Sequence, residues 1–225
     1  MLLEPKILRD TSISSGFSFN TEKYKSQEAF QESLIGKKTK KMLFLNQEHT
    51  DKVAVYPGSN LNTPFDAIIT QRKGYYLFLK TADCNPILFF DSKSNLIGAI
   101  HAGWRGIHQK IITKTMDLAI KKYNLDINTV KFIVGPSIRS CCYEVKEDLV
   151  QEFTESFDST EDFFTKRLGK IHFDQIEAIK QEFNTLGVKS QNVEIIDQCT
   201  HCSDQYFSFR KNKTKMRNIS FIGMN

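Results

Sequence analysis

Residues 86–106 read PILFFDSKSNLIGAIHAGWRG, and this stretch indicates the fold more clearly than any other part of the chain. Two apolar runs, Ile87–Phe90 and Leu96–Ile100, flank a short polar segment, which is typical of a β-hairpin. Apolar residues at helical spacing begin directly after Gly106. The stretch therefore predicts two paired strands followed by a helix, with His101 at the junction.

The sequence on either side of this hairpin adds further strands and helices. Runs rich in β-branched and aromatic residues predict strands at Met42–Leu45, Val53–Tyr56, Ala67–Thr70, Tyr75–Leu79, Val130–Val134, Val193–Ile196, Phe207–Phe209 and Ile219–Ile222. Helical periodicity predicts helices at Ile107–Tyr123, Leu149–Phe157 and Ile176–Leu186. Gly187 is expected to end the last helix. The polar, Lys-rich residues 21–41 are expected to form a short helix and a loop.

Strands that first cluster and then alternate with helices predict an α+β fold, with mixed β-sheets flanked by helices. The 225 residues are expected to form a single domain, residues 1–225. With 40% hydrophobic residues, including 18 Phe, the chain can build a sizeable core and is not expected to be disordered. Its apolar runs are too short to cross a bilayer and no secretory signal is legible, so a cytoplasmic location without a membrane partner is expected.

The charge of the chain is mild. Lys and Arg exceed Asp and Glu by 31 − 26 = +5, which predicts no nucleic-acid partner. The basic residues are densest at Arg210, Lys211, Lys213, Lys215 and Arg217. A solvated loop between two strands explains this cluster most simply, and an edge that binds phosphate is the alternative.

One set of candidate metal ligands comes from three separate segments. His49 and Cys84 each follow a predicted strand, and His101 ends another, so the three side chains are expected to meet at one edge of a sheet. One thiolate and two imidazoles suit Zn²⁺ and leave a fourth position for water, whose pKa the metal lowers. The structural alternatives are a small buried Cys84, a helix-start His101 and a surface-loop His49.

The segment His101–Gly106 is unusual for a purely structural turn. Two glycines flank the only Trp of the chain and Arg105, which suits a tight turn whose backbone approaches a ligand. The start of the following helix could hold an anion, with Arg105 adding a charge-assisted hydrogen bond.

The other four cysteines have no clear role in the sequence. An odd total of five argues against a disulfide framework. A structural four-cysteine zinc site usually contains two C-x-x-C pairs, whereas here Cys199 and Cys202 would have to be joined by the adjacent Cys141 and Cys142. No βαβ pattern frames a redox pair either. The sequence therefore favours neither a metal site nor a redox site at these residues.

Several ordered motifs carry a resemblance to a known family. They are Gly16–Ser18, Gln47 with His49 and Val53, Asp66–Thr70, Thr81–Pro86, His101–Gly106, Gly135–Ile138, Cys142–Val145, Cys199–Thr200 and Phe207–Arg210. Together they resemble the polyphenol oxidase or laccase-domain family, whose members are also called purine nucleoside phosphorylase and peptidoglycan editing factor. The resemblance covers most of the chain and implies a single α+β domain with one zinc held by His49, Cys84 and His101.

The resemblance also implies an activity. Phosphate would attack C1′ of adenosine, inosine, guanosine or methylthioadenosine and release the purine base, and some members deaminate adenosine. In this interpretation Cys84 and His101 are catalytic, Arg105 binds the substrate or phosphate, and adjacency to Cys84 makes Asp83 a candidate for supporting the site or transferring a proton. A blue-copper centre also uses two His and a Cys, so Cu²⁺ is a second metal to consider. A multicopper oxidase would need more imidazoles than the five histidines present.

Two departures from the family pattern concern how the polar end of the substrate is held. Family members often carry an Arg and two glycines before the N-terminal Ser, whereas Thr11–Gly16 contains one Gly and no Arg. Near the C-terminus, Met216-Arg217 replaces the usual Gly-Arg pair.

Two other functions are compatible with the same residues. An amidase that edits UDP-muramoyl peptidoglycan precursors would use the zinc, or a Cys84–His101 nucleophile–base pair, and release an amino acid instead of a purine. A non-enzymatic, zinc-stabilised binding module would unfold when its metal is removed.

Overall fold

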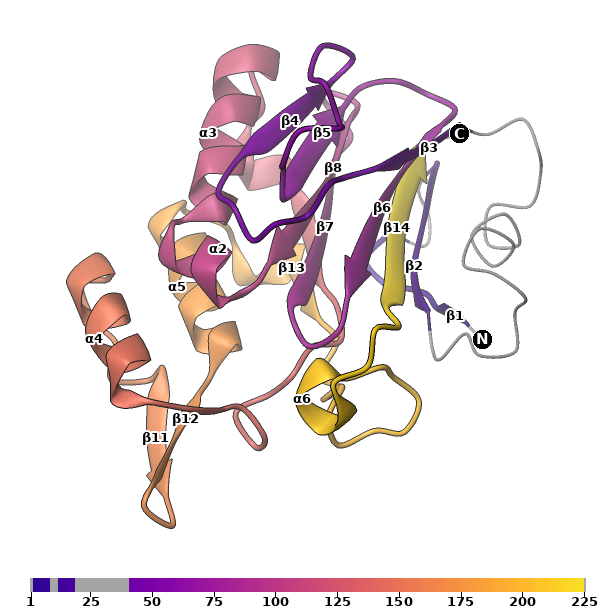
Figure 1. The fold of residues 1–225 in the computed structure, drawn as a ribbon. Helices are drawn as coiled ribbons and strands as arrows, with labels where there is room; N and C mark the ends of the chain where they lie inside the picture. Colours follow the sequence, from indigo (N-terminus) through magenta and orange to yellow (C-terminus); the bar gives the residue numbers. More distant parts are fainter. Residues whose placement is uncertain (1, 9–11, 19–40, 225) are drawn as a thin grey trace.

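Three β-sheets organise the part of the chain that the computed structural model describes, residues 2–8, 12–18 and 41–224 (Figure 1). A six-stranded and a five-stranded sheet pack face to face, and helices cover the other face of the six-stranded sheet. A small three-stranded sheet extends from one end. The predicted α+β fold with mixed sheets and flanking helices is confirmed. The helix and loop predicted before residue 41 lie outside the described residues.

The six-stranded sheet contains the predicted hairpin at its centre. Its strand order is β13-β9-β7-β8-β5-β4. The strands are β4 (Val53–Tyr56), β5 (Ala67–Thr70), β7 (Asn85–Asp91), β8 (Leu96–Ala102), β9 (Lys131–Val134) and β13 (Val193–Ile195). β7 and β8 pair antiparallel with Ile87 opposite Ile100, whereas the outer pairs β4/β5 and β9/β13 are parallel.

The five-stranded sheet joins the two ends of the chain. Its order is β1-β2-β14-β6-β3, and only β3 and β6 run parallel. The strands are β1 (Leu2–Leu3), β2 (Ile13–Ser18), β3 (Lys41–Phe44), β6 (Tyr75–Thr81) and β14 (Asn218–Met224). The small sheet contains β10 (Glu144–Val145), β11 (Phe164–Arg167) and β12 (Lys170–Phe173).

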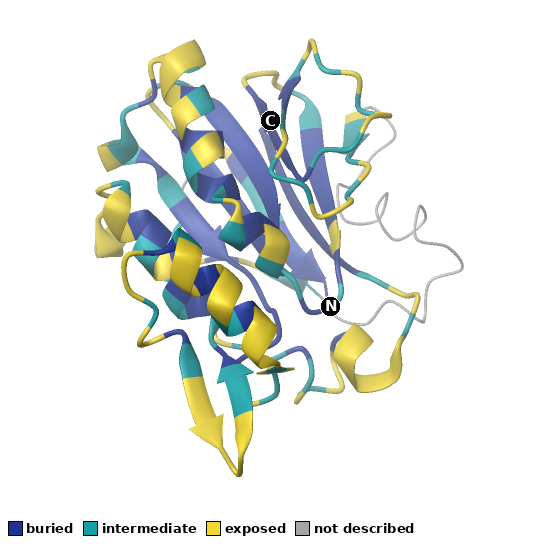
Figure 2. Ribbon diagram, turned by 60° about the vertical axis from the view of Figure 1, so that its left-hand side comes forward, coloured by how far each residue is buried: buried dark blue, intermediate teal, exposed yellow. Residues whose placement is uncertain are grey.

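Five α-helices occur among the described residues: α2 (Trp104–His108), α3 (Ile111–Tyr123), α4 (Glu147–Ser156), α5 (Gln175–Thr185) and α6 (Phe209–Asn212). Figure 2 shows exposed outer faces on the helices and buried strands behind them. None of the helices in the described ranges has the length and apolar character needed to cross a membrane.

Alternation along β7 explains how one sheet serves two hydrophobic cores. Ile87 and Phe89 face the core beneath the helices, whereas Leu88 and Phe90 face the core between the two large sheets. Successive side chains of a strand point to opposite faces, so a strand covered on both sides is apolar at every position. This is why the run Ile87–Phe90 has no polar residue.

Two predictions of local structure are wrong. The helix predicted at Ile107–Tyr123 is broken into α2 and α3, because Lys110 adopts a left-handed conformation (φ 61°) between them. The strand predicted at Phe207–Phe209 does not form, because Ser208 caps α6 and Phe209 is the first residue of that helix. Here the Ser208 hydroxyl accepts a hydrogen bond from the Lys211 amide, so helix capping prevails over the aromatic pattern. The prediction that Gly187 ends α5 is confirmed, since Gly187 follows the helix with φ 75°.

A buried carboxylate joins α5 to the start of α3. Glu182, 2% exposed, accepts hydrogen bonds at Oε2 from the Thr113 amide (3.1 Å) and hydroxyl (3.0 Å). Burial raises the pKa of Glu182 from 4.5 to about 7, against the opposing hydrogen bonds from Thr113. The folded protein therefore binds this proton more tightly than the unfolded chain does, and the associated stability is lost as the pH rises through about 7.

Replacing this carboxylate tests the pH dependence. Glu182→Gln mimics the protonated acid at every pH, whereas the wild type loses stability as the carboxylate ionises. The free energy of unfolding of the variant minus that of the wild type should therefore increase by about 2 kcal/mol from about pH 5 to about pH 8. Urea titrations at the two pH values measure the change. Glu177→Gln, which removes a partly exposed carboxylate paired with Lys180 on the same helix, is the control. A stability difference between Glu182→Gln and the wild type that does not change with pH would contradict the raised pKa of Glu182.

Candidate active site and metal centre

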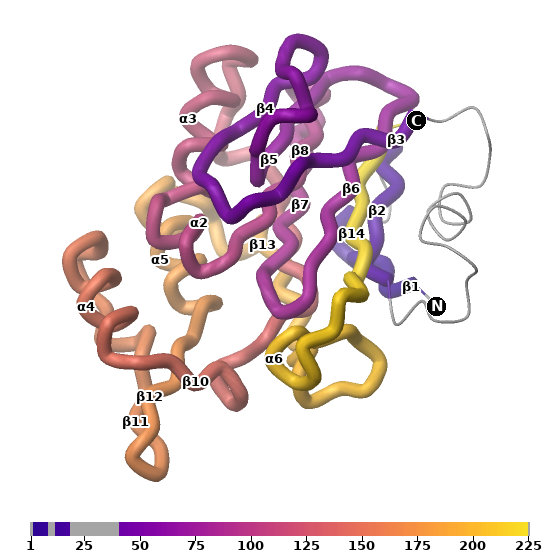
Figure 3. Tube along the Cα trace, in the orientation of Figure 1, coloured from indigo at the N-terminus to yellow at the C-terminus, as the bar shows by residue number. Residues whose placement is uncertain are grey.

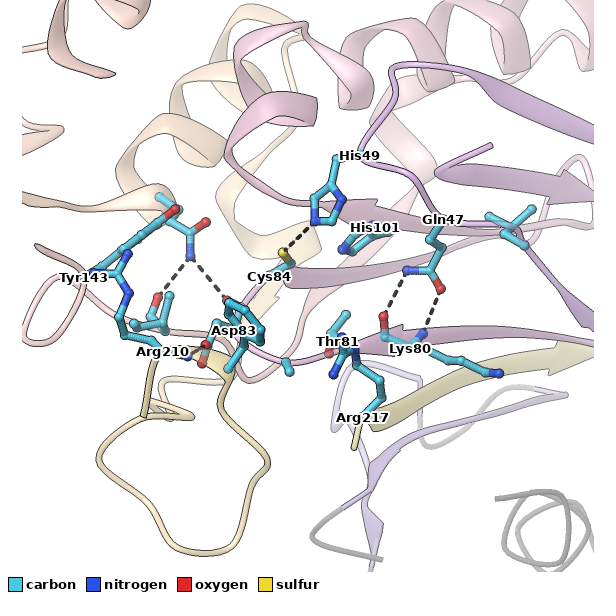
Figure 4. A pocket seen from close by; sticks show the side chains of 15 residues that line it. Gln47, His49, Lys80, Thr81, Asp83, Cys84, His101, Tyr143, Arg210 and Arg217 are labelled. Carbon is cyan, nitrogen blue, oxygen red and sulfur yellow. Dashed lines mark hydrogen bonds between the residues drawn. The ribbon is translucent and has the colours of Figure 1, made fainter. Parts of the chain in front are cut away.

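A cavity of about 470 Å³ opens where β6 ends and β7 begins (Figure 4). This size is typical of sites for small molecules. Its lining residues are Leu45, Gln47, His49, Lys80, Thr81, Ala82, Asp83, Cys84, His101, Ile138, Tyr143, Gln175, Phe209, Arg210 and Arg217. The residues come from segments far apart in the sequence, and the trace in Figure 3 shows the C-terminal segment around α6 near the start of β14, which pairs with the end of β6.

The structure brings the three candidate metal ligands together at this cavity. The ligand atoms of His49, Cys84 and His101 all lie within 4.8 Å of one another. His49 Nε2 lies 3.7 Å from Cys84 Sγ, and the two imidazole rings meet edge to face. His49 is exposed, Cys84 is half-buried and His101 is buried, so the group lies at the cavity wall and not in the core.

Asp66, immediately before β5, fixes the orientation of His101. Its Oδ1 lies 2.6 Å from His101 Nδ1, and both side chains are buried. A carboxylate on one ring nitrogen leaves the other nitrogen free to bind a metal and makes it a stronger ligand. The motif Asp66–Thr70 contributes to the family resemblance, but sequence reasoning did not assign Asp66 a role.

The same carboxylate also holds the segment that carries His49. The amides of Glu48, His49 and Thr50 donate to Asp66 at 3.2, 3.1 and 2.6 Å. His49 adopts a left-handed conformation, with φ 59°. A positive φ at a residue with a Cβ costs conformational energy. The three amide hydrogen bonds to Asp66 offset this strain, because a buried carboxylate without donors would be far more costly.

A missing side chain at Gly103 makes room for the ligand group. A Cβ at this position would lie 2.9 Å from His49 Cδ2 and 3.0 Å from Cys84 Sγ. Gly103 is therefore required for close packing of the backbone against two of the candidate ligands. The close approach of the backbone predicted for His101–Gly106 therefore occurs at Gly103, but Trp104–Gly106 begin helix α2 and do not form a turn.

The electrostatics favour an ionised thiol. Burial acts to raise the pKa of Cys84, but His101 and His49 outweigh it and lower the pKa to about 6. Burial acts to lower the pKa of His101, but Cys84 and Asp66 raise it to about 9. Cys84 is thus held as the thiolate that metal binding requires, and a metal would displace the proton of His101. The donor set and the space beside Gly103 fit a zinc ion or another metal that binds sulfur and nitrogen.

Asp83 lines the cavity, but both of its carboxylate oxygens already accept hydrogen bonds. Oδ1 accepts from the Thr200 hydroxyl at 2.7 Å, and Oδ2 accepts from the Arg210 amide at 2.7 Å. Asp83 also has φ 94°, a costly conformation for a residue with a Cβ. The residue therefore ties the C-terminal segment to the β6–β7 connection.

Two of the cations at the cavity come from the basic cluster that the sequence places near the C-terminus. Arg210 and Arg217 line the cavity together with Lys80. Arg105 is exposed on α2, lies 4.4 Å from the centre of the Trp104 ring and is absent from the lining residues. The interpretation of the cluster as a solvated loop holds for Lys213 and Lys215, which follow α6 and are exposed, whereas Lys211 is exposed but lies within α6.

Two further lining residues escaped sequence reasoning. Gln47 exchanges hydrogen bonds with the backbone of Lys80, donating at 3.0 Å and accepting at 2.9 Å. Tyr143 is half-buried against the cavity, and burial holds its pKa above the ordinary value, so its hydroxyl keeps its proton. Both residues lie within the motifs that carry the family resemblance, which is the only signal that could have identified them.

The remaining cysteines are brought together as well. The sulfur atoms of Cys141, Cys142, Cys199 and Cys202 all lie within 4.8 Å of one another. The expectation that adjacent cysteines are poorly placed to join a C-x-x-C pair is wrong. A turn in which the Cys142 amide donates to the Arg139 carbonyl at 2.9 Å directs both thiols to one side.

Comparisons with known proteins give a family match, related sequences and a shared fold. Residues 20–225 match the family model described as multi-copper polyphenol oxidoreductase laccase. A purine nucleoside phosphorylase of Aquifex aeolicus is 35% identical over 179 residues, which are 78% of this chain and 79% of the relative. An adenosine deaminase, RL5, from an unknown prokaryotic organism is 28% identical over 65% of this chain and 56% of its own length. A crystal structure of the Bacillus licheniformis hypothetical protein YfiH shares the fold, with TM-score 0.87, 21% identity and coverage of 100% of this chain and 96% of that chain.

Removing the charge of Asp66 should weaken metal binding. In Asp66→Asn the amide no longer matches the protonated His101 ring or the three amide donors, so the affinity for Zn²⁺ should fall by about ten- to a hundred-fold. Competition with a fluorescent zinc chelator measures this affinity.

Asp91→Asn is the matched control for this variant. Asp91 is another fully buried carboxylate, whose partners Ser94 and Thr129 lie at the far end of the β7–β8 hairpin. The affinity of Asp91→Asn for Zn²⁺ should match that of the wild type. Equal affinities in all three proteins would show that Asp66 does not support the ligands.

Proposed function

The chain belongs to the multi-copper polyphenol oxidoreductase laccase family, and from this premise we propose that it is a zinc-dependent purine nucleoside phosphorylase. Its substrates would be phosphate and adenosine, inosine, guanosine or methylthioadenosine. The observation that carries the proposal is the position of His49, Cys84 and His101 in the wall of a cavity that two arginines also line. A metal-ligand group and anion-binding side chains thus face the same small space.

The cavity offers suitable groups for each part of a nucleoside and a phosphate. The aromatic rings of Tyr143 and Phe209 line it and suit stacking against a purine. Arg210 and Arg217 suit an anion, because a guanidinium binds phosphate through two parallel hydrogen bonds. We therefore assign the base to the two aromatic rings and phosphate to the two guanidinium groups. These groups are neighbours and do not form separate sides of the cavity, because Arg210 Cζ lies 5.1 Å from the centre of the Tyr143 ring.

In the proposed reaction a phosphate oxygen bonds to C1′ while the glycosidic bond to the purine nitrogen breaks. The electron pair of that bond leaves with the base, which takes up a proton. His49, Cys84 and His101 would hold the zinc, which would act as a Lewis acid. The arginines bind and orient phosphate, and the protonated Tyr143 hydroxyl can donate a hydrogen bond to the substrate. Asp83 keeps Arg210 in place through the Arg210 amide.

Deamination of adenosine is a second candidate activity. The relative named adenosine deaminase RL5 supports it. In this reaction water attacks C6 of the purine, ammonia leaves and inosine forms. The same ligand group and cavity would serve, without a requirement for phosphate.

Product analysis separates the candidate activities. Purified, Zn²⁺-loaded protein incubated with inosine or adenosine should release free base only when phosphate is present. Cys84→Ala should lose at least about a hundred-fold in rate, because it removes a metal ligand. Chromatography of the bases and nucleosides is the measurement.

Other outcomes point to other functions. Inosine formed from adenosine without phosphate would assign deamination. No turnover of any purine nucleoside would contradict the proposal and give priority to the UDP-muramoyl amidase, which is tested by release of a free amino acid. Unfolding on chelation, again without turnover, would favour a zinc-stabilised binding module.

Substitution of the arginines tests how phosphate is held. Arg217→Ala should raise KM for phosphate about ten- to a hundred-fold and leave KM for inosine nearly unchanged, because one charge-assisted hydrogen-bond pair is lost. Initial rates at varied phosphate concentration measure the effect.

Two further variants complete this test. Lys213→Ala removes an exposed cation of the same segment, and its KM for phosphate should equal that of the wild type. Arg105→Ala tests whether phosphate is bound by Arg105, as the sequence predicts, or by the arginines that line the cavity. Full phosphate-dependent activity in Arg105→Ala would exclude Arg105, and an unchanged KM in Arg217→Ala would exclude Arg217.

A further inference from the structure

Outside the candidate active site, the described residues contain a second group that could hold a metal. It consists of Cys141, Cys142, Cys199 and Cys202, called here the four-cysteine cluster. Cys142 Sγ lies 3.2 Å and Cys141 Sγ lies 3.6 Å from Cys202 Sγ, and all four sulfur atoms fall within 4.8 Å of one another. No role in purine chemistry accounts for this convergence.

The spacing of the sulfur atoms suits a tetrahedral metal. With Zn–S bonds of about 2.3 Å, the sulfurs of a tetrahedral site are about 3.8 Å apart. The two separations, 3.6 and 3.2 Å, lie slightly below this value and well beyond a covalent S–S bond of about 2 Å. A tetrahedral set of four sulfurs selects zinc or iron among the common metals.

The backbone around the cluster has the form that a thiolate site needs. The Ser203 amide donates to the Cys199 carbonyl at 3.2 Å, which closes a turn containing the C-x-x-C pair. The Arg139 amide points at Cys199 Sγ at 3.5 Å. Amide groups aimed at sulfur stabilise its negative charge, in the way that hydrogen bonds around metal ligands generally do.

A buried cation lies beside the cluster. Arg139 is 8% exposed, and its guanidinium forms an ion pair with Asp197 at 3.5 Å. It also interacts electrostatically with Asp174 and, more weakly, with Cys199 and Cys141. Four thiolates with one divalent metal form a doubly negative complex, which this guanidinium partly neutralises. Arg139 is in turn fixed by hydrogen bonds to the Ser137 hydroxyl (2.7 Å) and the Ile196 carbonyl (2.5 Å).

We propose that the four-cysteine cluster binds one Zn²⁺ as a structural site separate from His49, Cys84 and His101. The metal joins the turn that ends at Cys142 to the segment that begins at Cys199. When Zn²⁺ binds, the thiol protons that it displaces leave to solvent.

By linking the turn that ends at Cys142 to the segment that begins at Cys199, the metal would make one wall of the cavity rigid. Ile138 and Tyr143, on either side of the first turn, line the cavity. Thr200, beside Cys199, donates to the Asp83 carboxylate, which also accepts from the Arg210 amide. The metal would therefore hold together the two segments that carry Tyr143 and Arg210, whose guanidinium Cζ lies 5.1 Å from the centre of the Tyr143 ring.

The test uses Cys84→Ser, because this variant disables the first site and leaves the cluster intact. After chelation under reducing conditions and addition of Zn²⁺, elemental analysis should find two zinc ions per wild-type chain and one per Cys84→Ser chain. Cys202→Ser should also retain one, and Cys84→Ser/Cys202→Ser should retain none. Cobalt alone, loaded into Cys84→Ser, should give thiolate-to-metal charge-transfer absorption about four times that of Cys202→Ser, whose only site has one thiolate.

Two results would overturn the proposal. One is the finding that folded, reduced Cys84→Ser binds no zinc. This result does not depend on whether any variant of the four-cysteine cluster folds. The other is a mass deficit of two hydrogens in the purified wild type together with no zinc bound at the cluster after reduction, which would assign a disulfide. Neither readout depends on turnover, so failure of the purine phosphorylase proposal leaves this test unaffected.

Discussion

The Asp66 carboxylate is the single interaction on which the candidate site depends. It accepts from the backbone of Glu48, His49 and Thr50 and from the Thr50 hydroxyl, and it lies 2.6 Å from His101 Nδ1. A fully buried carboxylate is tolerated only when donors surround it, so the loop and the imidazole must both be in place. One anion thereby positions two of the three candidate ligands, although His49 and His101 belong to different segments.

The two-sheet packing places the third ligand opposite them. Cys84 lies in the short connection between β6 of the five-stranded sheet and β7 of the six-stranded sheet. The connection therefore crosses from one sheet to the other, where both sheets are anchored in the shared core through residues such as Leu79 and Leu88. A thiol at this crossing is held by two buried strands, and the absence of a side chain at Gly103 brings it close to His49.

Sequence reasoning succeeded where a local pattern and the tertiary environment agree. The buried hairpin, most other strands and the convergence of His49, Cys84 and His101 follow from apolar periodicity and from the ends of strands. It failed where one backbone conformation or one capping bond decides the outcome, as at Lys110 and Ser208. The role of Asp66 could not be predicted, because nothing in the sequence tells which of many carboxylates is buried. The proximity of the cysteines was missed because it arises from two turns and a parallel bridge between Ser137 and Cys199.

Asp83 and Asp66 show a common solution to the problem of building a site from distant loops. Each is buried and accepts backbone amides from a segment far away in sequence, Asp66 from residues 48–50 and Asp83 from Arg210. A buried carboxylate with several donors has one favourable geometry, so it defines the position of a loop more sharply than apolar packing does. The loop that carries His49 and the short helix that carries Arg210 are thus fixed by charge, whereas the sheets beneath them are fixed by hydrophobic burial. This division explains why the cavity can expose polar groups of both signs on a scaffold whose strands are almost entirely apolar.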